Sequence, residues 1–429
     1  MNIIKKYLPL LFIFQSFLFA QSGWFQQSSG TNKKLNSGYF LNDNTGFAAG
    51  NGGVILKTTN SGINWANVYS VGIYDVLTVS FLNSITGWAF IQGSTTDSTF
   101  LLKTTNSGSS WNKSFIDTTY VRLNTSEFRF LNENTGYLAN SIDLKKTTNG
   151  GLSWVVVNSG ALFPSNLTFL SETTGWAAGF QTSLYKTTDG GQNWFQQFKN
   201  QSNTFSRGII FPNSTTGFYA TDYYIYRSTD GGDNWSESFY AFNIYPASMS
   251  FLNANTGWAL SSIADTTLRN VVLKTVNAGI SWNVYELNLQ NRKFRDIFFS
   301  SQNTGWIVGD SGYIYRTTNG GVPIGIQPIS TEIPGDYSLW QNYPNPFNPS
   351  TKISFSIPLS RGVSEGRGVF TKLIVYDILG REVEILLNEE LRPGTYEIDF
   401  DGSNYPSGVY YYKLSTGSYV KTRKMVLVK

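Results

Sequence analysis

The chain has 429 residues, of which 16% are aromatic and only 14% charged, with a formal net charge of +4 at pH 7. This composition excludes a disordered chain and a coiled coil, and the length is sufficient for two or three domains. The sequence has no cysteine and no histidine, which excludes disulfides, thiolate nucleophiles, the commonest general base and the usual zinc ligand. We therefore expect no cofactor and no metal site.

Residues 1–20 have the pattern of a secretory signal peptide. Lys5 and Lys6 form a basic start, the apolar stretch Tyr7–Phe19 follows, and Ala20 is a suitable last residue before cleavage. The alternative is a membrane anchor, but the 13 residues of this stretch fall short of the roughly 20 that span a bilayer. Without the leader the net charge falls to +2. We therefore expect no transmembrane segment in the mature chain and no nucleic-acid partner.

Two short signatures recur along the first three quarters of the chain. One is a turn such as KTTNSGINW (Lys57–Trp65), and the other precedes each turn, as in LNDNTGF (Leu41–Phe47). The glycines of the second signature lie at 46, 87, 136, 175, 217, 257 and 305, at intervals of 39 to 49 residues. A period near 40 with this density of Gly, Thr and aromatic residues is typical of β-propeller blades and not of helical repeats. The repeat therefore predicts seven blades.

Each repeat predicts four short strands. The second strand starts at the aromatic residue after the glycine, the third ends in Lys/Arg-Thr-Thr, and the fourth starts at the tryptophan of the turn. The first strand ends in a phenylalanine six residues before the glycine, at Phe40, Phe81, Phe130, Phe169, Phe211, Phe251 and Phe299. We expect these aromatic side chains to supply the packing that a lone four-stranded sheet lacks.

The seventh copy of the turn, Arg316–Gly321, ends without its tryptophan. At the other end of the chain, GWFQQSSG (Gly23–Gly30) closely resembles NWFQQFKN (Asn193–Asn200), the expected fourth strand of blade four. We therefore expect the first mature segment, from Trp24, to supply the fourth strand of blade seven. Such a closure leaves no open sheet edge, and it assigns residues 21–321 to the propeller.

The segment Trp24–Gly321 resembles the Asp-box propellers of the BNR and Ycf48-like (photosystem II assembly factor-like) families, through its tandem TGW and KTTNGG-W motifs. The resemblance implies the fold. Ycf48-like proteins are associated with an arginine-rich binding surface, and arginines are sparse here, so we do not carry photosystem binding over. In the box itself Asp or Asn bonds nearby amides, glycine supplies a positive φ and tryptophan anchors the hairpin. We therefore interpret the boxes as structural and not as catalytic or metal-binding.

The repeat ends at residue 322. Residues 322–336 are rich in Pro and Ile with almost no charge and predict an extended linker. Residues 337–429 show alternating strands separated by Gly-containing turns, which indicates a small antiparallel sandwich of six or seven strands. An insert at Ser360–Gly368 is expected to be a loop. The predicted fold class is thus all-β, a seven-bladed propeller closed by its N-terminal strand and followed by an Ig-like sandwich.

This last segment resembles the type A carboxy-terminal sorting domain of the type IX secretion system, which is related to the FlgD-like Ig fold. The matching residues are Tyr343, Pro344, Asn345, Pro346, Phe347, Asn348 and Pro349 at its opening, Gly380 in its middle, and Gly408 and Lys424 at its end. The resemblance implies the type IX secretion machinery as a partner. It also implies a secreted or outer-membrane surface-attached protein that travels through the periplasm. The alternative is an ordinary Ig-like adhesion module.

The Asp boxes and the NTG loops are expected on one face of the ring, so the links between blades and the turns between second and third strands form the other. Two of those turns, Ile91–Thr99 and Ser261–Asn270, carry insertions of roughly five and six residues, and loops on a rigid scaffold usually carry recognition. The predicted ligand-binding residues there are Tyr74, Tyr120, Asp222, Tyr223, Tyr224, Tyr245 and Asp310, with Tyr240 and Phe242 in the same aromatic cluster. Tyrosines suit stacking on sugars or docking of a protein. The alternative is that they cap the blades.

These residues favour a secreted or surface-displayed binding propeller whose ligand is a glycan or a protein, and not an enzyme. The alternative is a glycoside hydrolase of sialidase-like or xyloglucanase-like type, because Asp boxes also occur in those enzymes. Hydrolysis needs two carboxylates about 5 Å apart for retention or about 6.5–9.5 Å apart for inversion. Asp75, Asp222 and Asp310 fall in the expected functional loops, but nothing in the sequence pairs them. A third possibility is a purely structural matrix or adhesion component.

Overall fold

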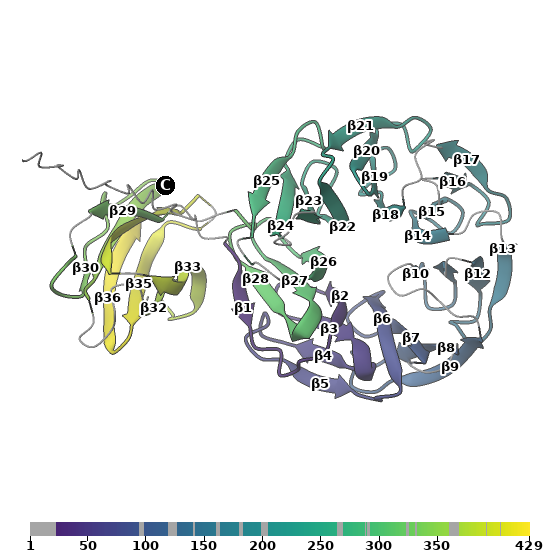
Figure 1. Cartoon of the computed structure of the whole chain (residues 1–429), viewed down its shortest axis with the longest axis horizontal. Coiled ribbons are helices and arrows are strands. Elements are labelled where there is room, and N and C mark those ends of the chain that lie inside the picture. Colours follow the sequence, from purple (N-terminus) through teal and green to yellow (C-terminus); the bar gives the residue numbers. More distant parts are fainter. Residues whose placement is uncertain are drawn as a thin grey trace, which may run out of the picture.

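The computed structural model shows an all-β chain with a ring and a separate sandwich (Figure 1). The structure describes residues 23–93, 98–118, 127–139, 142–159, 164–179, 183–198, 205–263, 269–287, 289, 292–322, 326–330, 333–359, 369–391, 393–403 and 405–429. The predicted leader, Tyr120 and the insert 360–368 lie outside these residues. Across the described ranges, no helix has the length and apolar character needed to cross a membrane.

The described residues from β1 to β28 form seven four-stranded antiparallel sheets around a central opening (Figure 1). Each blade runs from its innermost strand outward. The blades are β2 (Leu35–Phe40), β3 (Gly46–Gly50), β4 (Ile55–Thr58), β5 (Ala66–Tyr69); β6 (Tyr74–Phe81), β7 (Gly87–Gly93), β8 (Thr99–Thr104), β9 (Asn112–Asp117); β10 (Glu127–Phe130), β11 (Gly136–Ala139), β12 (Asp143–Thr147), β13 (Val155–Ser159); β14 (Pro164–Phe169), β15 (Gly175–Gly179), β16 (Leu184–Thr187), β17 (Phe195–Phe198); β18 (Ser206–Ile210), β19 (Gly217–Thr221), β20 (Tyr224–Ser228), β21 (Ser236–Tyr240); β22 (Ile244–Phe251), β23 (Gly257–Ile263), β24 (Arg269–Thr275), β25 (Asn283–Glu286); and β26 (Phe294–Phe299), β27 (Gly305–Gly309), β28 (Ile314–Thr317) with β1 (Phe25–Gln27).

The start of the chain completes the last blade, which confirms the predicted closure. Strand β1 pairs antiparallel with β28, and Phe25 lies opposite Arg316. Trp24 is buried and meets Phe299 edge-on, with ring centroids 5.8 Å apart. A Cβ added at Gly321 would lie 2.9 Å from the indole of Trp24. Trp24 therefore occupies the place of the tryptophan that the seventh turn lacks.

A repeated aromatic stack joins each blade to the one before it. The phenylalanine near the end of each first strand lies face to face with the aromatic residue that follows the signature glycine of the preceding blade, with centroids 3.5–4.2 Å apart. The same phenylalanine meets the tryptophan of its own blade edge-on at 5.8–6.2 Å. Phe40 of blade one stacks on Trp306 of blade seven. The stack therefore closes on itself around the ring, and both edge-on and offset-stacked pairs are favourable arrangements of aromatic rings.

This stack explains the glycine of each TG signature. In all seven blades, a Cβ at the glycine would lie 2.2–2.8 Å from the phenylalanine ring of the same blade. No side chain fits at that separation, because the ring is held between two other aromatic groups. The Thr-Gly-aromatic pattern is therefore a packing requirement between blades.

The Asp boxes are hydrogen-bonded turns, as interpreted from the sequence. In every box the hydroxyl that ends the third strand accepts a bond from the backbone N–H four residues later, at 2.8–3.0 Å. In blades four and five the box residue is Asp189 or Asp230. Each of these carboxylates accepts backbone N–H bonds, from Asn193 and Asn234 foremost, which lowers its pKa to about 2. The boxes thus satisfy their own turn amides.

Replacing both box aspartates by asparagine is expected to make the ring less sensitive to acid. The pKa of Asp189 and Asp230 in the folded chain is about 2, below the ordinary 3.8. Their ionised forms therefore contribute stability above pH 3.8, and this contribution is lost as the pH falls towards 2. Asparagine already occupies this position in the other five boxes, so Asp189→Asn with Asp230→Asn keeps the turn. Thermal unfolding between pH 5 and pH 2 measures the effect, with Asp233→Asn as the control, and an unchanged acid slope contradicts it.

The described residues after the ring form two four-stranded antiparallel sheets packed face to face over one hydrophobic core. One sheet holds β29 (Ile326–Ser330), β34 (Gly394–Asp401), β31 (Ser350–Ile357) and β30 (Ser338–Leu339); the other holds β33 (Glu382–Leu391), β32 (Val369–Tyr376), β35 (Gly408–Thr416) and β36 (Tyr419–Leu427). Two expectations differ from this arrangement. The sandwich has eight strands and not six or seven, and β29 lies inside the segment expected to be a linker. Its low charge and content of Pro and Ile suited an edge strand as well as a linker.

Candidate functional site

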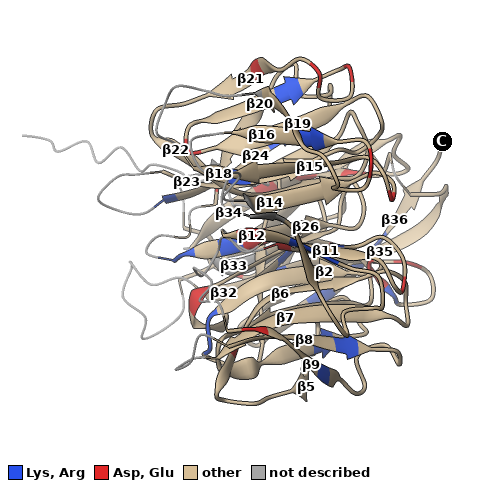
Figure 2. Cartoon of the chain, turned by 90° about the vertical axis from the view of Figure 1, so that its right-hand side faces the viewer, with Lys and Arg blue, Asp and Glu red and all other residues tan. Residues whose placement is uncertain are grey.

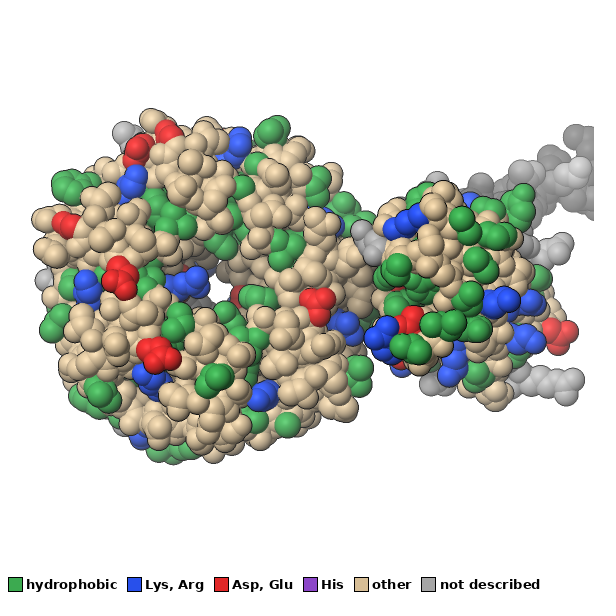
Figure 3. All heavy atoms as spheres, turned by 180° about the vertical axis from the view of Figure 1, so that it is seen from behind, with side chains coloured by type: hydrophobic (Ala, Val, Ile, Leu, Met, Phe, Trp, Pro, Cys, Tyr) green, Lys and Arg blue, Asp and Glu red, His purple; other side chains and the backbone are tan. Residues whose placement is uncertain are grey.

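The ring has two distinct faces. The Asp boxes lie beside the NTG loops, as shown by the bond from the Ser61 N–H to the Asn44 carbonyl at 2.8 Å and its equivalents in other blades. The opposite face, which we call the link face, carries the links between blades and the turns between second and third strands. Charged residues are scattered over the ring when it is seen from the side (Figure 2), and in the view from behind a Lys or Arg side chain lies at the edge of the opening (Figure 3).

Three aromatic side chains, one exposed and two half-buried, form a group on the link face of blades five and six. We call Tyr223, Phe242 and Tyr245 the aromatic platform. The rings of Tyr223 and Phe242 are nearly parallel, 13° apart with centroids at 5.7 Å, and Tyr245 lies 5.2 Å from Tyr223. Phe242 is 73% exposed. The Tyr223 and Tyr245 phenols are hydrogen-bonded to each other, so their hydroxyls lie side by side. This bond raises the pKa of the Tyr223 phenol.

Three elements bring these rings together. Tyr223 lies in the turn between β19 and β20, Phe242 in the link from blade five to blade six, and Tyr245 in β22. Tyr224 stacks on Tyr240 at 4.7 Å next to the platform. Three of the residues predicted to bind a ligand, Tyr223, Tyr224 and Tyr245, therefore lie close together. Phe242 was expected in the same aromatic cluster but was not among the predicted binding residues.

Asp222 and Asp310 are engaged by arginines. The Arg207 Nε lies 2.7 Å from a carboxylate oxygen of Asp222, and the other oxygen accepts the Phe205 N–H at 2.9 Å. The Arg295 Nε makes the same 2.7 Å contact with Asp310. In both blades, therefore, the carboxylate holds the turn after the second strand to the innermost strand. This contact accounts for both aspartates without a ligand, and for Asp222 it also fixes the turn that carries Tyr223.

The remaining predicted residues lie elsewhere. The Tyr74 hydroxyl is bonded to the Lys113 Nζ at 2.7 Å, and its ring meets Phe100 edge-on, so Tyr74 caps blade two. The Asp75 carboxylate accepts the Gly52 N–H at 2.9 Å and fixes a turn of blade one. The two long turns extend their strands: β7 and β23 each have seven residues, against four or five in the other second strands. The tips, 94–97 and 264–268, lie outside the described residues.

The innermost strands carry polar side chains that sequence analysis did not single out. Three residues before the stack phenylalanine stand Ser37, Thr78, Glu127, Asn166, Ser248 and Asp296 in six blades, and Gly208, which has no side chain, in blade five. Asp296 accepts bonds from the Gly38 N–H at 2.9 Å and the Ser248 hydroxyl at 2.6 Å, and Glu127 accepts the Leu167 N–H at 3.0 Å. Burial raises the pKa of both acids, that of Glu127 to about 7. These contacts link neighbouring blades at the centre, where innermost strands expose unpaired amides.

A ring of four-stranded antiparallel blades around a central opening defines a β-propeller, and the sandwich after it is a separate domain. Residues 341–429 match the family described as the secretion system C-terminal sorting domain. The chain therefore carries a type IX sorting domain, which marks a protein for export to the cell surface or the medium. No curated protein matches the chain.

Several solved structures share the fold. YCF48 bound to D1 peptide is 17% identical with a TM-score of 0.54, over 69% of this chain and 95% of that one. YCF48 from Cyanidioschyzon merolae is 14% identical with a TM-score of 0.53, over 68% and 98%. The GH74 enzyme of Niastella koreensis is 12% identical with a TM-score of 0.57, over 93% and 74%. At these identities the likeness shows the propeller fold alone.

Proposed function

We propose that this chain is a non-catalytic binding protein, exported by its sorting domain, whose propeller holds a glycan on the aromatic platform. The observation that carries the proposal is the pair of nearly parallel rings, Tyr223 and Phe242, of which Phe242 is 73% exposed on the link face. The C–H face of a sugar ring packs on such a surface, and the neighbouring phenol hydroxyls of Tyr223 and Tyr245 suit its hydroxyl groups. A pre-formed platform also loses little conformational entropy on binding.

The platform is tested with the double variant Tyr223→Ala/Phe242→Ala of the mature chain. We expect binding to neutral polysaccharides, measured on a glycan array and by calorimetry, to weaken roughly tenfold or more, because aromatic side chains at the centre of an interface commonly contribute above about 1 kcal/mol each. Phe115→Ala is the matched control, since Phe115 is 54% exposed but belongs to blade two. Binding of neutral polysaccharides with the same affinity and the same stoichiometry in the double variant as in the unmodified chain, or a protein ligand captured in place of a glycan, contradicts the proposal.

The competing function is glycoside hydrolysis, to which the shared fold of the GH74 enzyme draws attention. The contacts of the two candidate acids argue against hydrolysis, which needs a pair of nearby carboxylates. Asp222 in blade five and Asp310 in blade seven are each paired with an arginine, and blade six lies between them. Release of reducing sugar that is lost in Asp222→Asn or Asp310→Asn would establish the hydrolase in place of the binding protein.

We also propose that the binding protein travels through the periplasm and is secreted or attached to the cell surface.

A further inference from the structure

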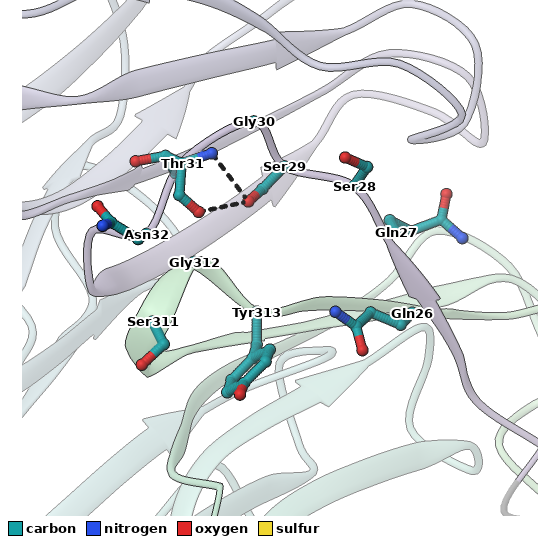
Figure 4. Close-up of a pocket in the computed structure, with 10 residues that line it drawn as sticks. All are labelled: Gln26, Gln27, Ser28, Ser29, Gly30, Thr31, Asn32, Ser311, Gly312 and Tyr313. Atoms are coloured by element: carbon teal, nitrogen blue, oxygen red, sulfur yellow. Dashed lines mark hydrogen bonds between the residues drawn. The ribbon is translucent and has the colours of Figure 1, made fainter.

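We infer a second binding site, for a short neutral oligosaccharide, in a pocket where the two ends of the propeller chain meet. The pocket lies on the link face between the segment from Gln27 to Asn32, which joins β1 to β2, and the turn η2 (Asp310–Gly312), which joins β27 to β28 (Figure 4). Its volume is about 530 Å³, within the range of about 300–1,000 Å³ of small-molecule sites. It is separate from the aromatic platform, and the inference does not depend on the platform binding anything.

The lining of this pocket is polar and uncharged. Apart from Gly30 and Gly312 it consists of amide and hydroxyl side chains, at Gln26, Gln27, Ser28, Ser29, Thr31, Asn32, Ser311 and Tyr313. Side chains of this kind donate and accept hydrogen bonds at once, as sugar hydroxyls require. No lining residue carries a charge to pair with an anionic or cationic ligand, so the chemistry selects a neutral polyhydroxylated molecule.

Two side chains in the pocket are already oriented. The Gln26 amide oxygen accepts the Tyr315 hydroxyl at 2.9 Å and the Arg292 Nη1 at 3.3 Å, so its NH₂ group faces the pocket (Figure 4). The Arg292 guanidinium lies 4.6 Å from the ring centroid of Tyr313, which holds this ring in place. The Gln26 NH₂ group can therefore donate to a hydroxyl at the edge of a sugar, while the Tyr313 ring packs against the face of that sugar.

The two walls of the pocket are in direct contact with each other. A Cβ added at Gly312 would lie 2.0 Å from the Thr31 carbonyl oxygen, so the turn and the link are in close contact there. The buried Ser29 hydroxyl donates to the Thr31 carbonyl at 3.1 Å and accepts the Thr31 N–H at 3.4 Å, which fixes the bend of the link (Figure 4). The backbone of the link and the turn therefore loses little conformational entropy when a ligand binds.

Because one wall comes from the start of the chain and the other from the last blade, the pocket exists only in the closed ring. A ligand that contacts both walls binds the closed form and not the open or unfolded chain. By mass action such a ligand raises the unfolding temperature in proportion to the logarithm of its concentration above the dissociation constant. Binding and ring closure are thus linked, which provides a readout that is independent of any activity.

The test uses the full mature chain with cellotetraose, xylotetraose and mannotetraose, and with tetragalacturonic acid as the charged comparison. Calorimetry and thermal unfolding followed by tryptophan fluorescence are expected to show that at least one neutral tetrasaccharide binds and raises the unfolding temperature. Tyr313→Ala is expected to weaken binding tenfold or more. Ser28→Trp is expected to do the same by filling the pocket, and Ser28 is exposed, so this variant leaves the fold intact.

These measurements are made in the platform variant Tyr223→Ala/Phe242→Ala, which lacks the other proposed sugar site, and one neutral tetrasaccharide is still expected to bind per chain. Phe115→Ala, at an exposed position of blade two, is the matched control and is expected to keep this binding unchanged. The inference is overturned if none of the neutral probes binds, if the acidic probe binds more tightly, or if Ser28→Trp binds as well as the unmodified chain. It is equally overturned if the platform variant abolishes the binding, because the sugar then occupies the platform and not the pocket. Failure of the platform itself leaves the pocket result unaffected, so the two proposals are distinguished.

Discussion

Trp24→Ala is expected to open the propeller and to lower its free energy of unfolding by about 3–5 kcal/mol, the usual cost of truncating a buried tryptophan. Trp24 is 4% exposed, packs on Phe299 and covers Gly321. Without the indole, β1 is held to β28 by three residue pairs alone. Loss of β1 would expose the edge of β28, so the variant is also expected to aggregate.

The measurement is denaturant unfolding followed by tryptophan fluorescence, which reports mainly on the ring because 11 of the 12 tryptophans lie there. Trp194→Ala is the matched comparison, since Trp194 makes the same edge-on contact with Phe169 in blade four. Its cost is expected to be smaller for two reasons: Trp194 is only half-buried, and its strand is anchored on both sides by the chain. Trp340→Ala, at a 43% exposed site in the sandwich, is expected to change stability by about 0.5 kcal/mol or less. Equal effects of Trp24→Ala and Trp194→Ala would show that ring closure adds nothing to local packing.

Removal of residues 323–429 is expected to abolish export and leave the propeller inside the cell envelope. Cell fractionation with an antibody to the propeller measures this result. The domain depends on the opening motif for its own fold: Phe347 is 2% exposed and packs against Phe400, and the Asn345 side chain accepts the Val426 N–H at 2.9 Å. Motif residues thus attach the start of the sandwich to its last strand. Export that continues without the domain would contradict the assignment.

The position of β29 sharpens this experiment. A reporter fused to residues 323–429 keeps the pairing of β29 with β34, in which Gln327 lies opposite Glu397. A reporter fused to residues 337–429 lacks that strand and leaves the edge of β34 unpaired. We therefore expect the longer fragment to direct more reporter to the cell exterior than the shorter one. Tyr343→Ala in the longer fragment is a useful further variant, because Tyr343 is 79% exposed and its loss leaves the core intact.

The blade repeat, the ring closure and the identity of the last domain could be predicted from the sequence, because each depends on a short run of neighbouring residues. The Thr-Gly-aromatic and Asp-box signatures contain the residues that form the turns. Trp24 takes the position of the tryptophan that the seventh copy lacks. The type IX motif is a contiguous run of residues from Tyr343 to Pro349. None of these required knowledge of which side chains meet across the ring.

The contacts between residues of different blades could not be predicted from the sequence and are known from the folded chain. The Gly38 N–H bonds to Asp296 across 258 positions of sequence, and Phe40 stacks on Trp306 across a similar separation; no local pattern states such a pairing. The structure also assigned Asp222 and Asp310 to arginines and gathered the aromatic platform on the link face, and it placed β29 in the sandwich. The physical reason is that a side chain's role depends on what the neighbouring blade presents to it, whereas a turn is determined by its own residues.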